Sequence, residues 1–255
     1  MVYRDLRRPP LPAAALRAEL ARDGIDLHVV EETASTNADL AAAAARGAPE
    51  GRVVVAERQT AGRGRLDRGW LSPAGAGLTF SVLLRPPVPV ARWGWLPLLT
   101  GVALVAALRE QAGVQAGLKW PNDVLVHGRK LAGVLSEAHG AAVVLGVGLN
   151  VSTRREELPD AGATSLALEG AATTDRPTLL KAAFRTLTRA YAGWLADPAA
   201  LPPAYRSVCV TLGRPVLVEL PGGQRLRGTA DAVDDAGRLV VDGRPLAVGD
   251  VVHVR

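Results

Sequence analysis

The sequence predicts an α+β protein, with helices packed on a mostly antiparallel mixed sheet and a small β-barrel at the C-terminus. Helical patterns alternate with apolar runs of strand length over residues 11–195. Three of these runs, between residues 123 and 151, are joined by links too short for a crossover helix, so these strands must be antiparallel. From about Arg206 the chain changes to short β-segments separated by Gly and Asp turns. We therefore expect two domains, residues 1–205 and 206–255.

The composition is that of a globular protein. With 255 residues and 48% hydrophobic content, the chain can bury one sizeable core and add a small second domain. Its 30 Lys and Arg against 25 Asp and Glu give a net charge of +5, mostly from arginine. Spread along the chain, this excess is a weak indication of nucleic-acid binding.

Cysteine use and apolar runs indicate a cytoplasmic protein without a membrane partner. Cys209 is the single cysteine, which excludes a disulfide framework and a cysteine-based zinc site within one chain. The N-terminus has no uninterrupted apolar run before Arg17, so we expect no secretory signal. The run Trp93–Leu108 is sixteen residues, too short for a bilayer, and predicts a buried helix.

Two helices are expected near the N-terminus. The first is Leu11–Arg22. The second begins at Ser35-Thr36-Asn37, continues through a run of alanines to Arg46 and ends at Gly47. Ser35 or Thr36 is its expected N-cap.

The next two strands, Arg52–Arg58 and Gly77–Arg85, are joined by an unusually long connection that begins "QTAGRGRLDRGW". It places Arg63, Arg65 and Arg68 on a glycine-rich segment, where ordering costs the most entropy. Two interpretations compete: a basic loop that wraps an anionic ligand, or a solvated loop. Connections of this length are more often functional.

The second half of the first domain supplies the antiparallel strands and one further helix. We expect strands at Asp123–Val126, Lys130–Glu137 and Ala141–Val151. The pattern of Arg176–Leu195 predicts a helix that packs on their sheet.

Several familiar kinds of site are excluded because their motifs are absent. A dinucleotide fingerprint would need a glycine where Asp67 stands, and neither a Walker A loop nor a Gly-x-Ser-x-Gly elbow occurs. The four histidines lack ligand spacing, so no protein-held metal site is predicted. These are His28, His127, His139 and His253.

The stretch "LKWPNDVLVHGRKLAGVLSE" is the most informative. Pro121 forces an extended or turned backbone, and Asn122 and Asp123 are turn formers at a strand entrance. Lys130 begins the next strand close by. A ligand site and a plain turn beside an edge-strand charge both fit this spacing. In "VVLGVGLNV", two glycines weaken a strand unless something approaches its backbone closely. Asn150, at its end, is either a ligand contact or a strand terminator.

Taken together, these segments resemble the biotin protein ligases. The resemblance covers about residues 28–255, and five motifs occur in the family's order and spacing. They are Ser35-Thr36-Asn37, "ERQTAGRGR" at 57–65 with Trp70 after it, "KWPND" at 119–123, "RKLAGVLSE" at 129–137 and "GVGLNV" at 146–151.

The resemblance implies a catalytic domain related to class II aminoacyl-tRNA synthetases and lipoate ligases, followed by an SH3-like domain. It implies that biotin and ATP, with Mg²⁺, give biotinyl-5'-AMP, and that a lysine of a biotin carboxyl carrier protein then takes the biotinyl group. Some members carry an N-terminal helix-turn-helix. Only about thirty residues precede the catalytic region here, so we expect the monofunctional type without DNA binding. The sequence leaves monomer and homodimer open.

The family's site residues can be placed on this sequence by resemblance. Lys130 and Arg65 would be the catalytic residues, with Lys130 bridging the biotin carboxylate and the phosphate. Asp123 is a candidate Mg²⁺ ligand. Biotin-binding residues would be Ser35, Thr36, Asn37, Gln59, Gly62, Arg63, Gly64, Arg65, Lys130 and Gly133. ATP-binding residues would be Trp70, Lys119, Asn122 and Asn150.

This chemistry suits a site without a general base. The carboxylate of biotin is already a nucleophile, so positioning and positive charge must supply the catalysis. We expect the glycine-rich loop to close over the adenylate and exclude water. Leu66-Asp67 replaces the Arg-Gly of many relatives and lowers the positive charge of this loop.

Two other functions are weighed against this one. The first is a lipoate or octanoate ligase or transferase of related fold. The second is a non-enzymatic nucleic-acid binder, which the 4% aromatic content disfavours, since only Trp70 lies near the loop arginines to stack on bases.

Overall fold

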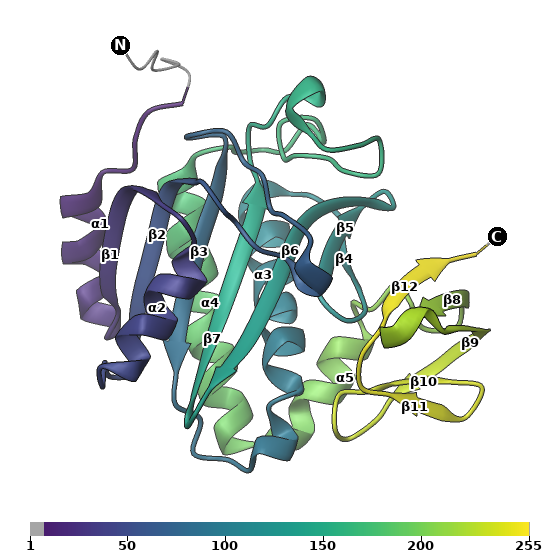
Figure 1. The fold of residues 1–255 in the computed structure, drawn as a ribbon. Coiled ribbons are helices and arrows are strands. Elements are labelled where there is room, and N and C mark those ends of the chain that lie inside the picture. Colours follow the sequence, from purple (N-terminus) through teal and green to yellow (C-terminus); the bar gives the residue numbers. More distant parts are fainter. Residues whose placement is uncertain (1–7, 255) are drawn as a thin grey trace.

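The computed structural model describes residues 8–254, and the rest of the two expected domains (residues 1–7 and Arg255) lies outside this range. A seven-stranded sheet in the order β1-β2-β3-β7-β6-β5-β4 forms its centre (Figure 1). Among the strands described for this sheet, only β1 and β2 pair in parallel, so the expected mostly antiparallel mixed sheet is confirmed. The strands are β1 (Asp26–Thr33), β2 (Arg52–Gln59), β3 (Gly77–Leu84), β4 (Ala116–Lys119), β5 (Asp123–Val126), β6 (Arg129–His139) and β7 (Ala142–Asn150).

β1 and β4 were not predicted from the sequence. β1 lies at the sheet edge, and Leu27 is its one buried side chain, so its pattern lacks the alternation of a half-buried strand. β4 has only four residues before the turn at Pro121. Strands buried along their whole length, such as β3 and β7, were predicted to within a residue or two.

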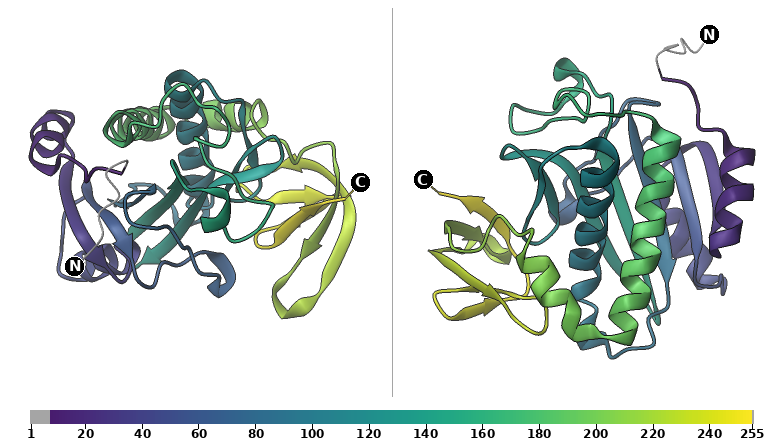
Figure 2. Two further views of the ribbon diagram at one scale, coloured as in Figure 1. Left: turned by 90° about the horizontal axis from the view of Figure 1, so that it is seen from above. Right: turned by 180° about the vertical axis from the view of Figure 1, so that it is seen from behind.

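Helices cover both faces of the sheet. α3 (Trp95–Ala112) and α4 (Arg176–Ala196) pack together on the rear face, while α2 (Thr36–Ala45) lies on the front face (Figures 1 and 2). α1 (Ala13–Leu20) packs beside β1, and the short α5 (Leu201–Arg206) follows α4. The predicted helices are confirmed, with small shifts at their ends.

α3 is the buried helix expected from the apolar run. Together with the turn before it, the apolar stretch spans residues 90–112, longer than the run counted in the sequence and long enough by length and composition to cross a membrane. In this fold, 56% of its most apolar window is buried. Leu96, Leu99 and Leu104 of this helix belong to the main core.

The N-terminus of α2 is capped from outside the helix. Ser35 occupies the N-cap position as expected, but its side chain makes no capping hydrogen bond. Instead, Oε1 of Gln59 accepts from the Thr36 backbone N–H at 2.8 Å. Because Gln59 ends β2, this bond fixes the helix start to the sheet.

The C-terminal region is a five-stranded antiparallel sheet in the order β11-β10-β9-β8-β12. Two tryptophan side chains from outside this sheet donate to backbone carbonyl groups in its 234–238 turn. Trp95 Nε1 reaches the Asp235 oxygen at 2.7 Å, and Trp120 Nε1 reaches the Gly237 oxygen at 3.1 Å. The strands are β8 (Pro215–Glu219), β9 (Arg225–Val233), β10 (Leu239–Val241), β11 (Arg244–Leu246) and β12 (Asp250–His253).

An ion pair joins the N-terminal segment to the chain after β7. Arg8 Nη2 lies 2.6 Å from Glu157 Oε2, and both side chains are largely buried. This hydrogen bond from Arg8 is the main cause that lowers the pKa of Glu157 from 4.5 to about 2.

The shift predicts a pH dependence of stability. A carboxyl group with a lowered folded-state pKa stabilises the fold above pH 4.5, and this contribution is lost as the pH falls toward about 2. In Glu157→Gln, the free energy of unfolding should fall less over this interval than in the wild type, by about 1 to 2 kcal/mol after allowance for solvent screening. Urea titrations across the interval measure this difference, and parallel curves for the two proteins would contradict it.

Candidate functional site

A pocket of about 600 Å³ lies on the front face of the sheet. Its walls are the N-terminus of α2, the glycine-rich loop (residues 60–76), the β5–β6 region and the start of β12. The pocket brings together all but one of the site residues expected from the sequence. It is lined by Ser35, Thr36, Asn37, Gln59, Arg63, Gly64, Arg65, Trp70, Lys119, Asn122, Lys130, Gly133 and Asn150.

Gly62, the remaining residue, shapes the loop rather than the pocket wall. Its carbonyl oxygen accepts from the Trp70 N–H at 2.8 Å. A Cβ at this position would lie 2.3 Å from the Trp70 carbonyl oxygen, so only glycine fits. Arg63 and Gly69 form a further bridge across the loop. The loop is therefore folded on itself and carries Trp70 over the sheet.

The loop also contacts the C-terminal sheet. Arg68 pairs with Asp250, and Arg65 Nη2 donates to the Gly249 oxygen at 3.3 Å. Burial lowers the pKa of Arg65, while the nearby Asp250 and Asp123 act in the opposite direction. The guanidinium stays charged at neutral pH because its ordinary pKa is so high. Sequence patterns gave no signal for Asp250, whose role depends on contact between two distant segments.

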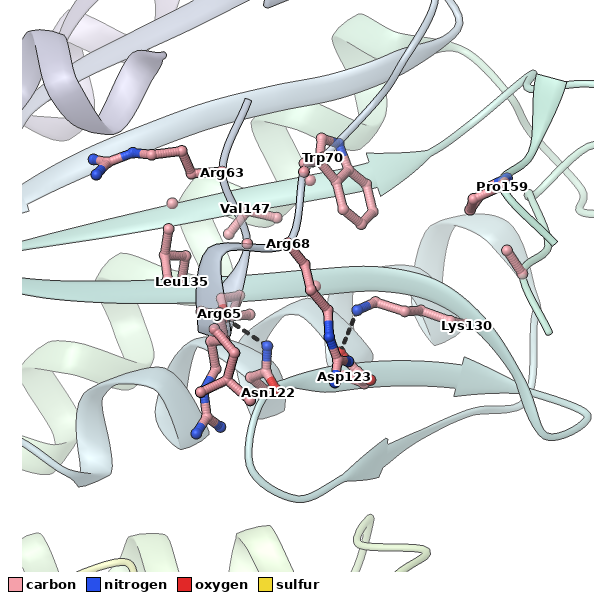
Figure 3. Close-up of a pocket in the computed structure, with 18 of the residues that line it drawn as sticks. Arg63, Arg65, Arg68, Trp70, Asn122, Asp123, Lys130, Leu135, Val147 and Pro159 are labelled. Atoms are coloured by element: carbon pink, nitrogen blue, oxygen red, sulfur yellow. Dashed lines mark hydrogen bonds and ion pairs between the residues drawn. The ribbon is translucent and has the colours of Figure 1, made fainter. Parts of the chain in front are cut away.

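Trp70 explains one of the glycines noted in the sequence. A Cβ at Gly148 would lie 2.2 Å from Trp70 Cε2, whereas one at Gly133 would first meet Lys130 Cε at 3.3 Å. Lys130 Nζ lies 5.8 Å from the centre of the ring, within the range of a cation–π contact (Figure 3). Trp70 Nε1 is buried and finds no acceptor among residues 8–254. A buried donor without a partner is expected where a ligand supplies the acceptor.

One end of the pocket is a network of short polar bonds. Gln59 Oε1 accepts from the Thr36 hydroxyl at 3.1 Å, and that hydroxyl lies 2.7 Å from Ser81 Oγ. Ser81 in turn donates to Asn37 Oδ1 at 2.6 Å. Ser81 is fully buried in β3 and was missed, because a single serine in an apolar strand carries no sequence signal.

Glu137 extends this network to the loop. Its Oε2 accepts from Asn37 Nδ2 at 2.7 Å and from Arg63 Nη2 at 3.0 Å. Glu137 lies in a motif noted in the sequence, but no role was predicted for it. Asn37 also accounts for Gly146, since a Cβ there would lie 2.2 Å from Asn37 Oδ1. Both glycines of β7 are thus closely approached, as their presence in a strand predicted.

The other end of the pocket is cationic. Lys130 Nζ lies 2.7 Å from Asp123 Oδ1 (Figure 3). Lys119 Nζ lies 3.9 Å from Asp123 Oδ2. One carboxylate thus faces two ammonium groups. His253 also lines this end, and its pKa is lowered by burial and then by Lys119 and Arg214. This end is suited to an anionic group.

The two asparagines of this region have their amide groups engaged with the backbone. Asn122 Nδ2 donates to the Val134 oxygen at 3.0 Å, and Asn150 Nδ2 donates to the Thr164 oxygen at 2.9 Å. The Thr164 N–H donates to the Lys130 oxygen at 2.8 Å. Asn150 therefore holds the segment after β7 against the strand that carries Lys130.

Comparisons with known proteins agree with this geometry. The family model for the biotin/lipoate A/B protein ligase family matches residues 29–152, and that for the biotin protein ligase C-terminal domain matches residues 211–254. The chain is 48% identical to the biotin–[acetyl-CoA-carboxylase] ligase of Mycobacterium tuberculosis, over 100% of both chains.

Two solved structures share the fold. Biotin protein ligase from Aquifex aeolicus in complex with biotin and ATP has a TM-score of 0.77 and 29% identity, covering 90% of this chain and 99% of that one. The Leishmania major enzyme in complex with biotinyl-5-AMP has a TM-score of 0.65 and 25% identity, covering 90% and 98%. With the full-length identity to the curated relative, these matches show that the chain belongs to the biotin protein ligase family.

Proposed function

We propose that this protein activates biotin with ATP to biotinyl-5'-AMP and transfers the biotinyl group to a lysine of a biotin carboxyl carrier protein. The observation that carries the proposal is a single pocket with a polar network at one end and two lysines with Trp70 at the other. An acid with a polar headgroup and a nucleotide could lie end to end in it. The 48% identity to a biotin–[acetyl-CoA-carboxylase] ligase supports the substrate.

The first step needs charge rather than proton transfer. The carboxylate oxygen of biotin attacks the α-phosphorus of ATP, and pyrophosphate leaves. Both reactants are anions, so cations must offset their repulsion. Lys130 and Arg65 are the catalytic residues of the proposal, with Lys119 as a further phosphate contact. In the second step the neutral ε-amine of the acceptor lysine attacks the acyl carbon, AMP leaves and a proton is released.

The remaining residues are assigned by position along the pocket. We propose that Ser35, Thr36, Asn37 and Gln59 contact the biotin headgroup, and that Arg63 and Gly64 lie beside its tail. Trp70, Asn122 and Asn150 would contact or position the nucleotide. The buried Nε1 of Trp70 supports this assignment, since it lacks an acceptor within the described part of the chain.

Mg²⁺ is proposed to arrive with ATP. Within residues 8–254, no group of three or more His, Cys, Asp or Glu side chains could hold a metal. Magnesium bound with nucleotides usually takes one or two protein carboxylates, and phosphates and water complete its shell. Asp123 fits this role: its buried Oδ1 contacts Lys130 without hydrogen-bond geometry.

Finer points of the family assignment are also proposals. We propose that the catalytic domain, with its pocket on the front face of an antiparallel sheet, is related to the class II aminoacyl-tRNA synthetases. We also propose that residues 206–255 form an SH3-like barrel. We propose a cytoplasmic protein that binds the carrier protein and not DNA. The single cysteine and the acceptor expected of this reaction support that location.

A two-step assay tests the function. Purified protein with biotin and ATP should release pyrophosphate, and addition of carrier protein should yield a biotinylated lysine detected by mass spectrometry. Lipoate or octanoate in place of biotin separates the related ligases. Transfer of either of these acids but not of biotin would reject the proposal.

Gly148→Ala should weaken use of ATP. The added Cβ would lie 2.2 Å from the Trp70 ring, which is rigid and must move. Overpacking of this kind costs about 1 to 3 kcal/mol, so we expect the KM for ATP to rise by about tenfold. Steady-state adenylation measures it. Gly193→Ala is the control, because nothing lies within 4 Å of its Cβ. An unchanged KM for ATP in Gly148→Ala would contradict the placement of Trp70.

A further inference from the structure

A buried group of hydrogen bonds and an ion pair around Glu57, the Glu57 hub, connects both ends of the glycine-rich loop. Glu57, near the end of β2, accepts from the Leu11 N–H at 2.6 Å through Oε1 and from Arg176 Nη1 at 2.6 Å through Oε2. Arg176 begins α4 and is 6% exposed. Its Nη1 also donates to the Gly77 oxygen at 3.3 Å, and its Nη2 donates to the Pro9 oxygen. Glu57 precedes the loop and Gly77 follows it.

A second group of contacts, the Glu157 clamp, joins the N-terminal segment to the other side of the pocket. Arg8 Nη2 lies 2.6 Å from Glu157 Oε2 and 2.8 Å from the Ser152 oxygen. Ser152 and Glu157 belong to the segment that follows β7, which reaches the pocket at Pro159 and Asp160. Arg8 also packs on Gly75, where an added Cβ would lie 3.0 Å from Arg8 Cβ.

Residues 8–11 therefore touch both segments that border the pocket. They run past the end of the sheet at which β2 and β7 end and β3 begins. This end is drawn at the top of Figure 1. The Glu57 hub holds residues 9–11, and the Glu157 clamp holds Arg8. None of these side chains lines the pocket.

We propose that residues 8–11 form a strap that fixes both ends of the glycine-rich loop and the segment after β7. Glu57, Arg176 and Arg8 are then positioning residues for Arg65 and Trp70. A loop rich in glycine gains many conformations when its ends are released, so anchored ends reduce the entropy lost on closure. Buried, charge-assisted hydrogen bonds are strong enough for this role, and loss of one partner leaves the other unpaired.

Limited proteolysis measures the strap directly, since trypsin cleaves after Arg63, Arg65 and Arg68 within the loop. We expect ligand-free Arg8→Gln and Glu57→Gln to be cut in the loop about tenfold faster than the wild type, because cleavage follows the population of the locally open state. Mass spectrometry of the fragments separates loop cleavage from the dispersed cleavage of globally unfolded protein. If Glu57→Gln fails to fold, Arg8→Gln alone provides the test.

Arg185→Gln is the matched control. Arg185 links α4 to Glu19 of α1 and to Asp23, and it touches neither pocket segment. We expect its loop cleavage to match the wild type. Loop cleavage of Arg8→Gln no faster than that of this control would overturn the strap.

The inference rests on the proposed function only where it concerns catalysis. In the strap variants, we expect bound biotinyl-5'-AMP to be hydrolysed by water about tenfold faster than in the control, because the loop opens more often. Hydrolysis equal to the control, despite faster cleavage, would overturn the positioning role. Failure of every protein to form the adenylate would count against the proposed function, and the proteolysis result would still decide the strap.

Discussion

Replacing Lys130 by methionine is expected to slow adenylate formation by about 30- to 1,000-fold, equivalent to about 2 to 4 kcal/mol of transition-state stabilisation. Lys130 Nζ lies 5.8 Å from the centre of the Trp70 ring and 2.7 Å from Asp123 Oδ1. Methionine keeps the length of the side chain but removes the charge that must offset two reacting anions. Arg65→Ala should reduce the rate by a similar factor.

Single-turnover release of pyrophosphate measures this effect apart from transfer to the carrier. Lys181→Met is the control, because Lys181 lies on α4 and pairs with Glu19 away from the pocket. It should react at close to the wild-type rate. If Lys130→Met and Arg65→Ala also react at near the wild-type rate, charge stabilisation by these residues is wrong, while the family membership stands.

Replacing Trp120 by alanine is expected to lower the free energy of unfolding by about 3 to 5 kcal/mol. Trp120 is 1% exposed and belongs to the main core, which also includes residues of the C-terminal sheet. Its Nε1 also donates to the Gly237 oxygen, so the substitution removes apolar packing and leaves a buried carbonyl unpaired. This is the largest effect on stability that we predict.

Two further variants separate packing from hydrogen bonding. Trp120→Phe keeps most of the apolar contact and loses the donor, so it should cost less than Trp120→Ala. Trp93→Ala is the control, because Trp93 is only half-buried and donates locally to the Val88 oxygen. Urea unfolding measures all three. A cost for Trp120→Ala no larger than that of Trp93→Ala would contradict this role of Trp120.

The elements that could be predicted from the sequence are those in which the order of apolar and polar residues follows their burial. β3 and β7 are buried along their whole length, and α4 follows a regular apolar stripe. β1 was missed because an edge strand exposes most of its side chains, and its parallel partner is set by distant residues. Local propensity carries no information about such pairing.

The pocket was predicted largely through the resemblance. Spacing alone left Lys130 and Asn150 with two interpretations each, and the structure brings both to the pocket. Ser81, Glu137 and Asp250 were not found, since each acts through residues far away in the chain. The anchors of the loop at Glu57 and Arg176 were missed for the same reason.

The two glycines of β7 restrict how this pocket can mutate. Asn37 fills the space above Gly146, and Trp70 fills the space above Gly148. A side chain at either position would require its neighbour to change as well. An inhibitor that binds against Asn37 and Trp70 would therefore meet few single-step routes to resistance at these two glycines.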